Sequence, residues 1–326
     1  MKPLLRKCLS RGLSALLVTT LTCLSAPASG DDWAAQLGYP PGKKVIIVHA
    51  HDMGMCYESN RSVAEFQQAG EKVSASAMPP CAWFLHAAQY ANSHPESDVG
   101  LQLTLNSEWS DYRWRPLSSA TSSGSLVDNR GFFWRSVVQT AVNATAEDVE
   151  QELEAQLLLA ERAGMKPTHL TTHLGALYSR PDLAEVYLQF AQRNWIPAVV
   201  VEITPELLER LAASGFPVPE NLAQAIENYP MPKLKDLRIV PRTESFEEKV
   251  QATLEQIDAL PEGLSQLALA PAVESDALKA LTPSWRQYVW DHQLLTNDAV
   301  RKRLAADDIV LTNWVEVMQR FSPAPQ

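Results

Sequence analysis

The sequence predicts an α/β fold, a (β/α) barrel of seven to eight strands that is irregular and TIM-like. Short apolar runs alternate with stretches of helical period along most of the 326 residues. The first such run, Val45 to Val48, consists only of β-branched residues, which is typical of a strand buried on both faces of a parallel sheet. A doubly wound open sheet is the alternative fold. No Gly-rich phosphate-binding motif is present, so the sequence gives no support to nucleotide binding.

Composition is ordinary for a globular protein with a sizeable core, and 326 residues allow one large domain or two smaller ones. Apolar residues make up 46% of the chain and charged residues 20%. We expect a signal peptide at 1–28, a linker at 29–43 and a single domain at 44–322. That domain carries an insertion rich in aromatic residues at 106–143, which is too long to be a simple connection.

The amino terminus is typical of a secretory signal peptide. Lys2, Arg6, Lys7 and Arg11 precede an apolar run, and small residues around Ala28 offer a cleavage site. Cleavage would remove four of the 28 Lys and Arg residues and none of the 38 Asp and Glu residues, and would change the formal net charge from −10 to −14. We therefore expect an exported protein, periplasmic or secreted in a bacterium, that has no membrane anchor and no nucleic-acid partner.

The predicted elements follow in alternation. Strands are expected at 45–48, 72–78, 98–105, 167–173, 198–201, 237–240, 264–270 and 309–311. Helices are expected at 59–69, 83–92, 146–163, 182–193, 205–213, 245–259, 284–293, 297–306 and 314–321.

Polar residues follow several of these strands. The first strand ends in His49, His51 and Asp52, and the third contains Gln102. The fourth strand carries His169 and His173 on one face, because side chains alternate along a strand. Carboxyl ends of parallel strands are where α/β proteins bind ligands, and His and Asp side chains there suit a zinc-like metal. The alternative is a hydrogen-bonded turn capped by Asp52, together with core histidines.

The chain resembles the YdjC-like (ChbG/HpnK) carbohydrate deacetylase family over nearly all of its predicted domain. The family's ADDFG or ADDLGM element, its SAS element, and its GLHLTL, PTHLDSH and HP motifs correspond in order to 50–55, 74–76, 100–105, 167–173 and 270–271. The resemblance implies a small carbohydrate as the ligand and metal-dependent removal of acetyl groups from N-acetylated sugars.

The resemblance also implies roles for individual residues. His51 stands at the family's general-base position, while Asp52 and His173 match metal ligands. A third ligand position holds Gln102, a poorer ligand than imidazole for a zinc-like ion. The implied cofactor is Mg²⁺ or Zn²⁺, which would activate water and polarise the amide carbonyl. Asn60 matches an Asn that follows the first motif and is expected to bind substrate.

Substitutions therefore fall on the predicted site, where Thr171 and Ala270 also replace an Asp and a His of the family. Two interpretations follow. Either a hydrolase survives with impaired or altered activity, with His51 as base or replacement ligand, or the protein is an inactive carbohydrate-binding relic. His49 and His169 are expected to support the site from behind.

Aromatic residues of the insertion offer surfaces on which a sugar ring could stack. Trp109, Tyr112 and Trp114 are the expected platform, whereas Phe132, Phe133 and Trp134 fit a small core of the insertion better.

Cys56 and Cys81 remain after export, and the sequence leaves open whether they form a disulfide or stay as buried thiols. The oligomeric state is not predicted.

Overall fold

The computed structural model describes residues 32–119, 121, 123–213 and 218–321. The predicted signal peptide at 1–28 lies outside this part of the chain. From Asp32 onward the chain forms one compact unit.

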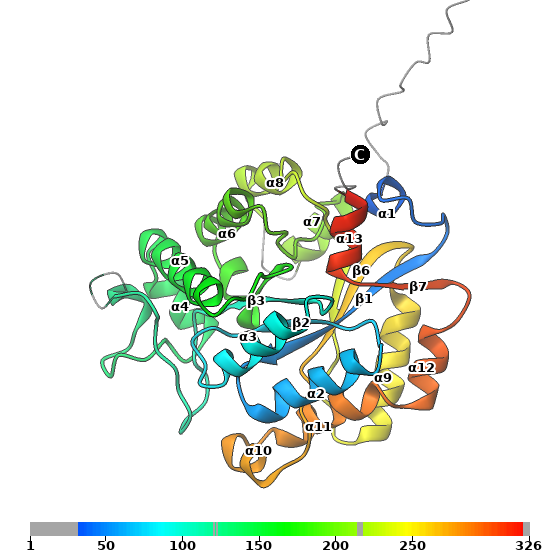
Figure 1. Cartoon of the computed structure of the whole chain (residues 1–326). Helices are drawn as coiled ribbons and strands as arrows, with labels where there is room; N and C mark the ends of the chain where they lie inside the picture. Colours follow the sequence, from blue (N-terminus) through cyan, green and yellow to red (C-terminus); the bar gives the residue numbers. More distant parts are fainter. Residues whose placement is uncertain (1–31, 120, 122, 214–217, 322–326) are drawn as a thin grey trace, which may run out of the picture. The chain divides into compact units, whose positions relative to one another are not determined.

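Seven parallel strands form one curled sheet in the described part of the chain (Figure 1). The order is β4-β3-β2-β1-β6-β5, and β7 pairs with β1 beside this path. The strands are β1 Lys44–Met53, β2 Ser74–Ala77, β3 Val99–Leu103, β4 Leu170–Thr172, β5 Asp236–Ile239, β6 Gly263–Leu269 and β7 Ile309–Thr312. The α/β class and the parallel sheet are as predicted, but the strands do not form a closed barrel.

Among the described residues, isolated bridges through the segment 198–201 link the two edges of the sheet. Leu170 pairs with Ala198, and Val201 pairs with Leu234, just before β5. The segment 198–201, predicted as a strand, is therefore not one. Its backbone still bonds on both sides, from the Val199 N–H to the Leu170 carbonyl and from the Glu202 N–H to the Leu234 carbonyl, but without a continuous ladder.

β1 is the central strand. It pairs with β6 along Lys44–Ala50, with β7 near its start and with β2 near its end. Residues Val45, Ile46 and Ile47 are completely buried, as expected for an apolar strand covered on both faces. The strand continues five residues beyond the predicted apolar run, which carries His49, His51 and Asp52 within the sheet itself.

Helices cover the outside of the sheet (Figure 1). The longer ones are α2 Tyr57–Gln68, α3 Phe84–Ser93, α5 Ala146–Arg162, α6 Pro181–Asn194, α7 Pro205–Ala213, α8 Glu220–Glu227, α9 Phe246–Ala259, α11 Trp285–Leu294 and α13 Trp314–Phe321. Shorter helices are α1 Trp33–Gln36, α4 Val137–Asn143, α10 Asp276–Leu281 and α12 Asp298–Leu304, with 3₁₀ turns η1 Gly124–Leu126 and η2 His173–Tyr178. No helix in the described ranges is long and apolar enough to cross a membrane.

Two predicted segments are more ordered than expected. In the expected linker, helix α1 forms and Ala34, Leu37 and Tyr39 pack into a core with Val45. The insertion contains η1 and α4. Both segments bury apolar side chains in the hydrophobic core. The spacing of apolar residues in the sequence did not predict this packing.

Cys56 and Cys81 are both free and buried. Burial raises the pKa of the Cys56 thiol to about 11, so the thiol stays protonated at neutral pH. The sequence left open a disulfide or two buried thiols, and in the structure the two cysteines are buried thiols.

Candidate functional site

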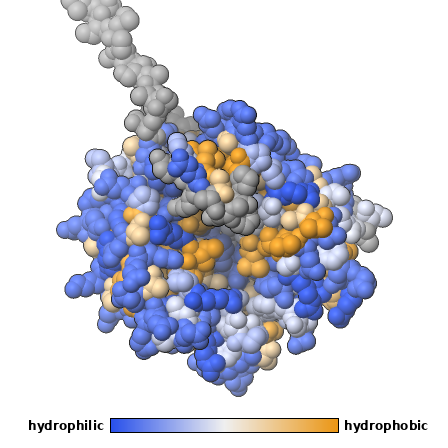
Figure 2. Space-filling view, turned by 180° about the vertical axis from the view of Figure 1, so that it is seen from behind, coloured by the Kyte–Doolittle hydropathy of each residue, from blue (hydrophilic) through white to orange (hydrophobic). Residues whose placement is uncertain are grey.

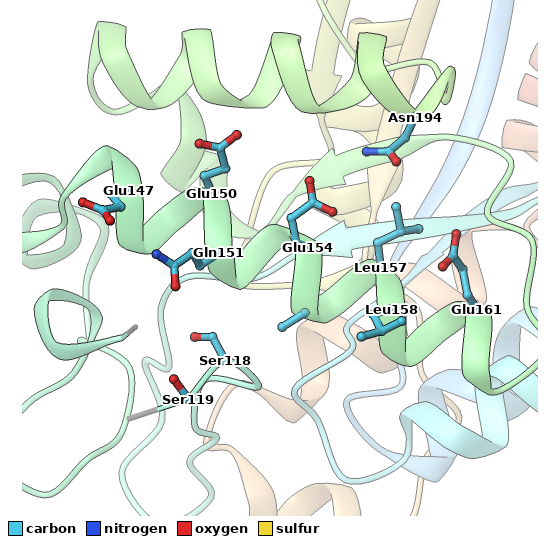
Figure 3. Close-up of a pocket in the computed structure, with 11 residues that line it drawn as sticks. Ser118, Ser119, Glu147, Glu150, Gln151, Glu154, Leu157, Leu158, Glu161 and Asn194 are labelled. Carbon is cyan, nitrogen blue, oxygen red and sulfur yellow. The ribbon is translucent and has the colours of Figure 1, made fainter. Parts of the chain in front are cut away.

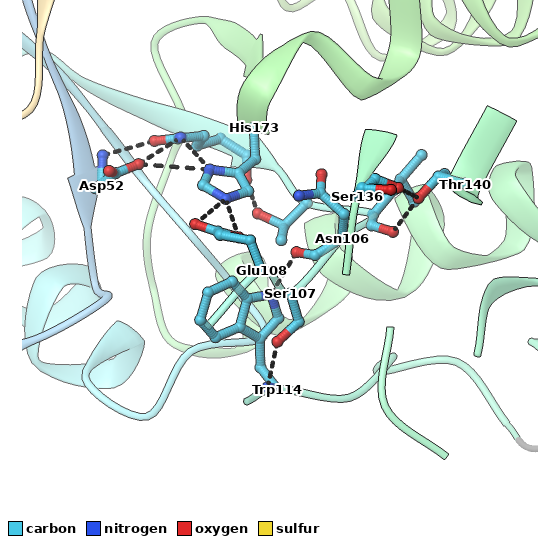
Figure 4. Close-up of polar contacts among 11 residues, drawn as sticks. Asp52, Asn106, Ser107, Glu108, Trp114, Ser136, Thr140 and His173 are labelled. Carbon is cyan, nitrogen blue, oxygen red and sulfur yellow. Dashed lines mark hydrogen bonds and ion pairs between the residues drawn. The ribbon is translucent and has the colours of Figure 1, made fainter. Parts of the chain in front are cut away.

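Side chains from three strand ends meet at one edge of the sheet. Asp52 comes from the end of β1, Gln102 from β3, and His173 from the residue that follows β4. All three are at most 7% exposed, and they contact one another directly (Figure 4). The prediction that the ends of these strands form a common cluster is confirmed.

A distortion at the end of β1 places Asp52 in this cluster. The register between β1 and β2 shifts between Ala50 and Met53, and Asp52 has a left-handed backbone with φ of 66°. Asp tolerates this conformation better than most residues, but it still costs free energy. Gly54 follows with φ of 84°, and a Cβ there would come within 3.3 Å of Met78 backbone atoms. The chain therefore turns sharply away directly after the carboxylate.

The amide of Gln102 connects Asp52 and His173. The backbone N–H of Asp52 donates to Gln102 Oε1 at 2.7 Å, and Ser76 Oγ donates to the same oxygen at 3.3 Å. Gln102 Nε2 donates to Asp52 Oδ1 at 2.8 Å and to His173 Nδ1 at 2.9 Å. Because a backbone N–H can only donate, it fixes which end of the amide is oxygen. Both amide hydrogens are consequently directed at Asp52 and His173.

His173 lies between two carboxylates. Its Nε2 is 3.1 Å from Glu108 Oε2, and its Nδ1 is 3.5 Å from Asp52 Oδ1 (Figure 4). Burial opposes the charged ring, but Glu108 and Asp52 outweigh burial and raise the pKa of His173 above its usual value. The amide of Gln102 has the opposite effect, because Nδ1 accepts its hydrogen bond only while unprotonated. Protonation of Nδ1 would set its N–H against the N–H of Gln102, so the hydrogen bonds of this structure are those of the neutral ring.

His51 is the other ionisable group of β1 at this edge, and it lines the same cavity. Burial lowers its pKa to about 4, although Asp52 acts in the opposite direction. The imidazole is therefore neutral at pH 7 and can accept a proton. The neutral ring has the lone pair that the predicted general-base role requires, while a pKa of about 4 makes it a weak base.

His49 and His169 form a buried pair behind this cluster. Their Nε2 atoms are 2.7 Å apart, and both side chains are completely buried. His169 Nδ1 lies 2.9 Å from Thr168 Oγ1 and 3.3 Å from Asp98 Oδ1. An ionised Asp98 holds the proton on His169 Nδ1, so His169 Nε2 accepts from His49 Nε2–H. The ring of His49 lies 4.5 Å from that of His51, centroid to centroid, which agrees with the predicted position behind the site.

Close packing of this pair explains a glycine in β3. A Cβ on Gly100 would lie 2.2 Å from the carbonyl oxygen of His169 and 2.8 Å from its ring. Only glycine at position 100 allows His169, directly before β4, to approach β3 this closely.

A cavity of about 900 Å³ opens over the cluster. Its lining combines His51, Asp52, Gln102, Glu108 and His173 with apolar and aromatic side chains, among them Trp109, Leu174, Ile239, Leu269 and Tyr288. In the space-filling view, apolar residues border a hollow in the surface (Figure 2). The volume is within the usual range for small-molecule sites.

The expected aromatic platform is only partly available to a ligand. Trp109 lines the cavity, and its ring packs edge-on against Tyr288 with centroids 6.3 Å apart. Trp114 is 4% exposed and donates from Nε1 to the carbonyl of Asn106. The Tyr112 hydroxyl donates to the carbonyl of Met55 at 2.7 Å. The structure thus supports Trp109 as a contact, makes Trp114 a packing residue, and uses Tyr112 to hold the turn after β1.

Asn60 does not reach the cavity, contrary to the prediction of a substrate contact. It is 1% exposed; its Oδ1 accepts from the Gly54 N–H at 2.5 Å, and its Nδ2 donates to the Trp83 carbonyl at 3.1 Å. The side chain therefore ties α2 to the turn after Asp52 and to the start of α3. Its role is structural support for the site.

Glu108 is a member of the cluster that the sequence analysis missed. It lies five residues beyond the end of β3, in a stretch assigned only to the insertion. Asp98, at the other end of β3, was also missed. Its carboxylate accepts from the Trp314 N–H at 2.6 Å and from the hydroxyls of Ser74 and Thr168. Glu108 could have been proposed from the sequence because it is an acidic residue shortly after the end of β3, where the other site residues lie.

A second depression, of about 750 Å³, lies along α5 (Figure 3). Glutamates of that helix line it, and two of them, Glu150 and Glu154, already pair with Arg193. None of the strand-end residues contributes to it. We therefore assign the functional site to the cavity at the strand ends.

Comparison with known proteins agrees with this assignment. The family model described as YdjC-like protein matches residues 45–306. A carbohydrate deacetylase of Thermus thermophilus is 35% identical over 264 residues, which cover 81% of this chain and 90% of that protein. A chitooligosaccharide deacetylase of Yersinia enterocolitica is 30% identical over 158 residues, covering 48% of this chain and 58% of that protein.

A solved structure shares the fold. It is an Enterococcus faecalis protein provisionally described as a cellobiose-phosphate cleavage protein, with a TM-score of 0.69, 21% identity, and coverage of 84% of this chain and 99% of that one. The match over residues 45–306, together with the Thermus relative, shows that the chain belongs to the YdjC-like family.

Proposed function

We propose that this protein binds an N-acetylated sugar in the cavity at the strand ends and hydrolyses its acetyl amide to acetate and a free amine. The observation that carries the proposal is the convergence of Asp52, Gln102 and His173, from three strand ends, on one cavity that also contains His51. Relatives named carbohydrate deacetylase and chitooligosaccharide deacetylase support the choice of substrate.

The cavity suits a sugar in size and in lining. A volume of about 900 Å³ accommodates one or two sugar rings. Trp109 and Tyr288 supply aromatic surface for the apolar face of a ring, and carboxylates and amides around them supply acceptors and donors for hydroxyl groups.

His51 is the proposed general base. Its neutral imidazole takes a proton from a water molecule, whose oxygen adds to the amide carbon. The same proton is then delivered to the amine nitrogen as the C–N bond breaks, so that acetate and amine leave. The Nε2–H of His173, which Glu108 accepts at 3.1 Å, becomes available to the carbonyl oxygen if the substrate displaces that partly exposed carboxylate.

The Mg²⁺ or Zn²⁺ implied by the family resemblance does not fit the residues as arranged. No group of three or more His, Cys, Asp or Glu side chains in the described part of the chain could hold a metal ion. Asp52 and Glu108 approach His173 at different ring nitrogens, so the two carboxylates do not converge on one point. We therefore assign no step of the reaction to a metal.

A second candidate function is carbohydrate binding without turnover. The specific observation that favours it is the amide of Gln102, which engages both Asp52 and His173. In this case the cavity and Trp109 retain the ligand while the cluster is only structural.

Export to the periplasm or the medium also remains a proposal, supported by the pattern of residues 1–28. An oxidising compartment would leave Cys56 and Cys81 protected by burial.

Acetate release from N,N′-diacetylchitobiose distinguishes the two functions. The hydrolase proposal expects acetate from the wild type, a loss of about 100-fold or more in His51→Ala, and little change in the control His94→Ala, which alters a histidine at the end of α3. Calorimetric binding of the disaccharide without acetate would support the second function. Neither binding nor release would refute both.

A further inference from the structure

The atoms around the Gln102 amide nitrogen are of the kinds that usually hold a divalent cation. A carboxylate oxygen, Asp52 Oδ1, lies 2.8 Å from Nε2, and an imidazole nitrogen, His173 Nδ1, lies 2.9 Å from it. Such oxygens and nitrogens present lone pairs, and together they are ordinary ligands for zinc and related ions. Here the carboxylate receives one amide hydrogen, and Nδ1 of the neutral imidazole receives the other.

The charge around this point also favours a positive group. Two carboxylates, Asp52 and Glu108, lie within 3.5 Å of the His173 ring, and the ring is 1% exposed. The cavity lining contains one lysine and one arginine: Lys249 pairs with Asp291 at 2.6 Å, and Arg242 donates to Ser284 Oγ at 3.1 Å. The two N–H bonds of the amide place partial positive charge where the carboxylate and the imidazole need it.

The amide is not free to turn over and offer its oxygen. Rotation by 180° would bring the amide nitrogen to 2.7 Å from the Asp52 N–H, with one donor facing another. It would also take the oxygen away from Ser76 Oγ. The side chain is 2% exposed, so water has little access to replace these bonds.

From this geometry we infer that the Gln102 amide occupies the place of a divalent cation, so that the Asp52–Gln102–His173 cluster is complete without a metal. The wild-type site therefore binds no divalent ion. A change at position 102 alone, to a residue that presents a lone pair or a negative charge, creates a cation site. This inference concerns the ion and is independent of whether the site turns over substrate.

Two substitutions test the inference. Gln102→Glu keeps the size of the side chain and replaces the NH₂ group by an oxygen, whereas Gln102→His supplies a third ligand of the zinc-binding type. The probes are Zn²⁺ and Mn²⁺, added to metal-free protein. Binding is followed by calorimetry and by metal content after gel filtration.

The wild type is expected to retain no stoichiometric ion. Each variant is expected to retain one ion per chain, with affinity at least about 100-fold above that of the wild type. Adding Asp52→Asn to either variant should remove the gain, which separates this site from surface binding. Circular dichroism spectra check that each variant is folded.

Two results would overturn the inference. One is a wild type that binds one divalent ion per chain and loses it in Asp52→Asn. The other is a pair of folded variants that bind no more metal than the wild type. The wild-type measurement decides the matter even if both variants fail to fold. Since no result depends on acetate release, failure of the proposed hydrolysis would be recognised separately.

Discussion

Gln102 and Asp52 are joined by two hydrogen bonds that run in opposite directions. The Asp52 N–H donates to the amide oxygen at 2.7 Å, and the amide nitrogen donates to the Asp52 carboxylate at 2.8 Å. This pairing holds the left-handed backbone of Asp52, at the end of β1, against β3. A conformation that costs free energy is thus retained by a side-chain contact between β1 and β3, the two strands on either side of β2.

Replacement of Gln102 by Ala should destabilise the fold. The change leaves the Asp52 N–H, the Asp52 carboxylate and His173 Nδ1 without their amide partner in a buried position, at a cost of about 2–4 kcal/mol. Urea unfolding measures this loss. As a control, Gln189→Ala on the exposed face of α6 should change stability by less than about 0.5 kcal/mol. Equal stability of both variants would show that the pairing contributes nothing.

The pH dependence of catalysis should report His51. Its pKa of about 4 keeps the imidazole neutral, and able to accept a proton, well below pH 6.5. We expect kcat/KM to stay nearly constant from pH 7 to pH 5 and to fall as His51 becomes protonated near pH 4. Steady-state rates of acetate release across this range provide the measurement. A fall centred near pH 6.5 would indicate an ordinary, exposed imidazole.

Glu108→Gln should lower the pKa of His173. The carboxylate of Glu108 is the strongest influence opposing burial of that ring, so neutralising it leaves Asp52 alone to stabilise the imidazolium. NMR titration of the His173 ring in both proteins would show a lower pKa in the variant. An unchanged titration curve would mean that Glu108 does not interact with the ring in solution.

Asp98 should stabilise the fold in a pH-dependent manner. Burial alone would raise its pKa, but contacts with His169, Ser74 and Thr168 outweigh burial and lower it. Since the folded pKa lies below the unfolded value of about 3.9, the stabilisation is complete above that pH and is lost as the pH falls through the folded pKa.

Asp98→Asn should therefore cost about 3 kcal/mol at pH 7, because it removes the charge that faces His169 and the Trp314 N–H. Urea unfolding of both proteins should give a difference that shrinks below about pH 4. A difference that stays constant from pH 7 to pH 3 would rule out ionisation of Asp98 as its source.

The parallel α/β fold and the core of the site could be predicted because they rest on short-range patterns. β-branched runs, helical periods and the turn after Asp52 are all local, and residues at the ends of parallel strands must meet. Asp52, Gln102 and His173 were grouped for this reason, and the structure brings them within hydrogen-bonding distance.

Contacts that depend on tertiary packing could not be predicted. Asn60 and Trp114 have side chains that suit a sugar site, but both are buried, and each bonds to backbone groups of neighbouring segments instead. Glu108 joins the cluster only because the insertion folds back over His173. Sheet closure likewise depends on whether 198–201 pairs as a full strand, which residue type alone does not determine.

The most direct test of the account is acetate release from N,N′-diacetylchitobiose by the wild type, measured with and without EDTA. A hydrolytic site based on His51, with the Gln102 amide in place of an ion, predicts the same rate in both conditions. Acetate release that EDTA abolishes and Zn²⁺ or Mn²⁺ restores would contradict it.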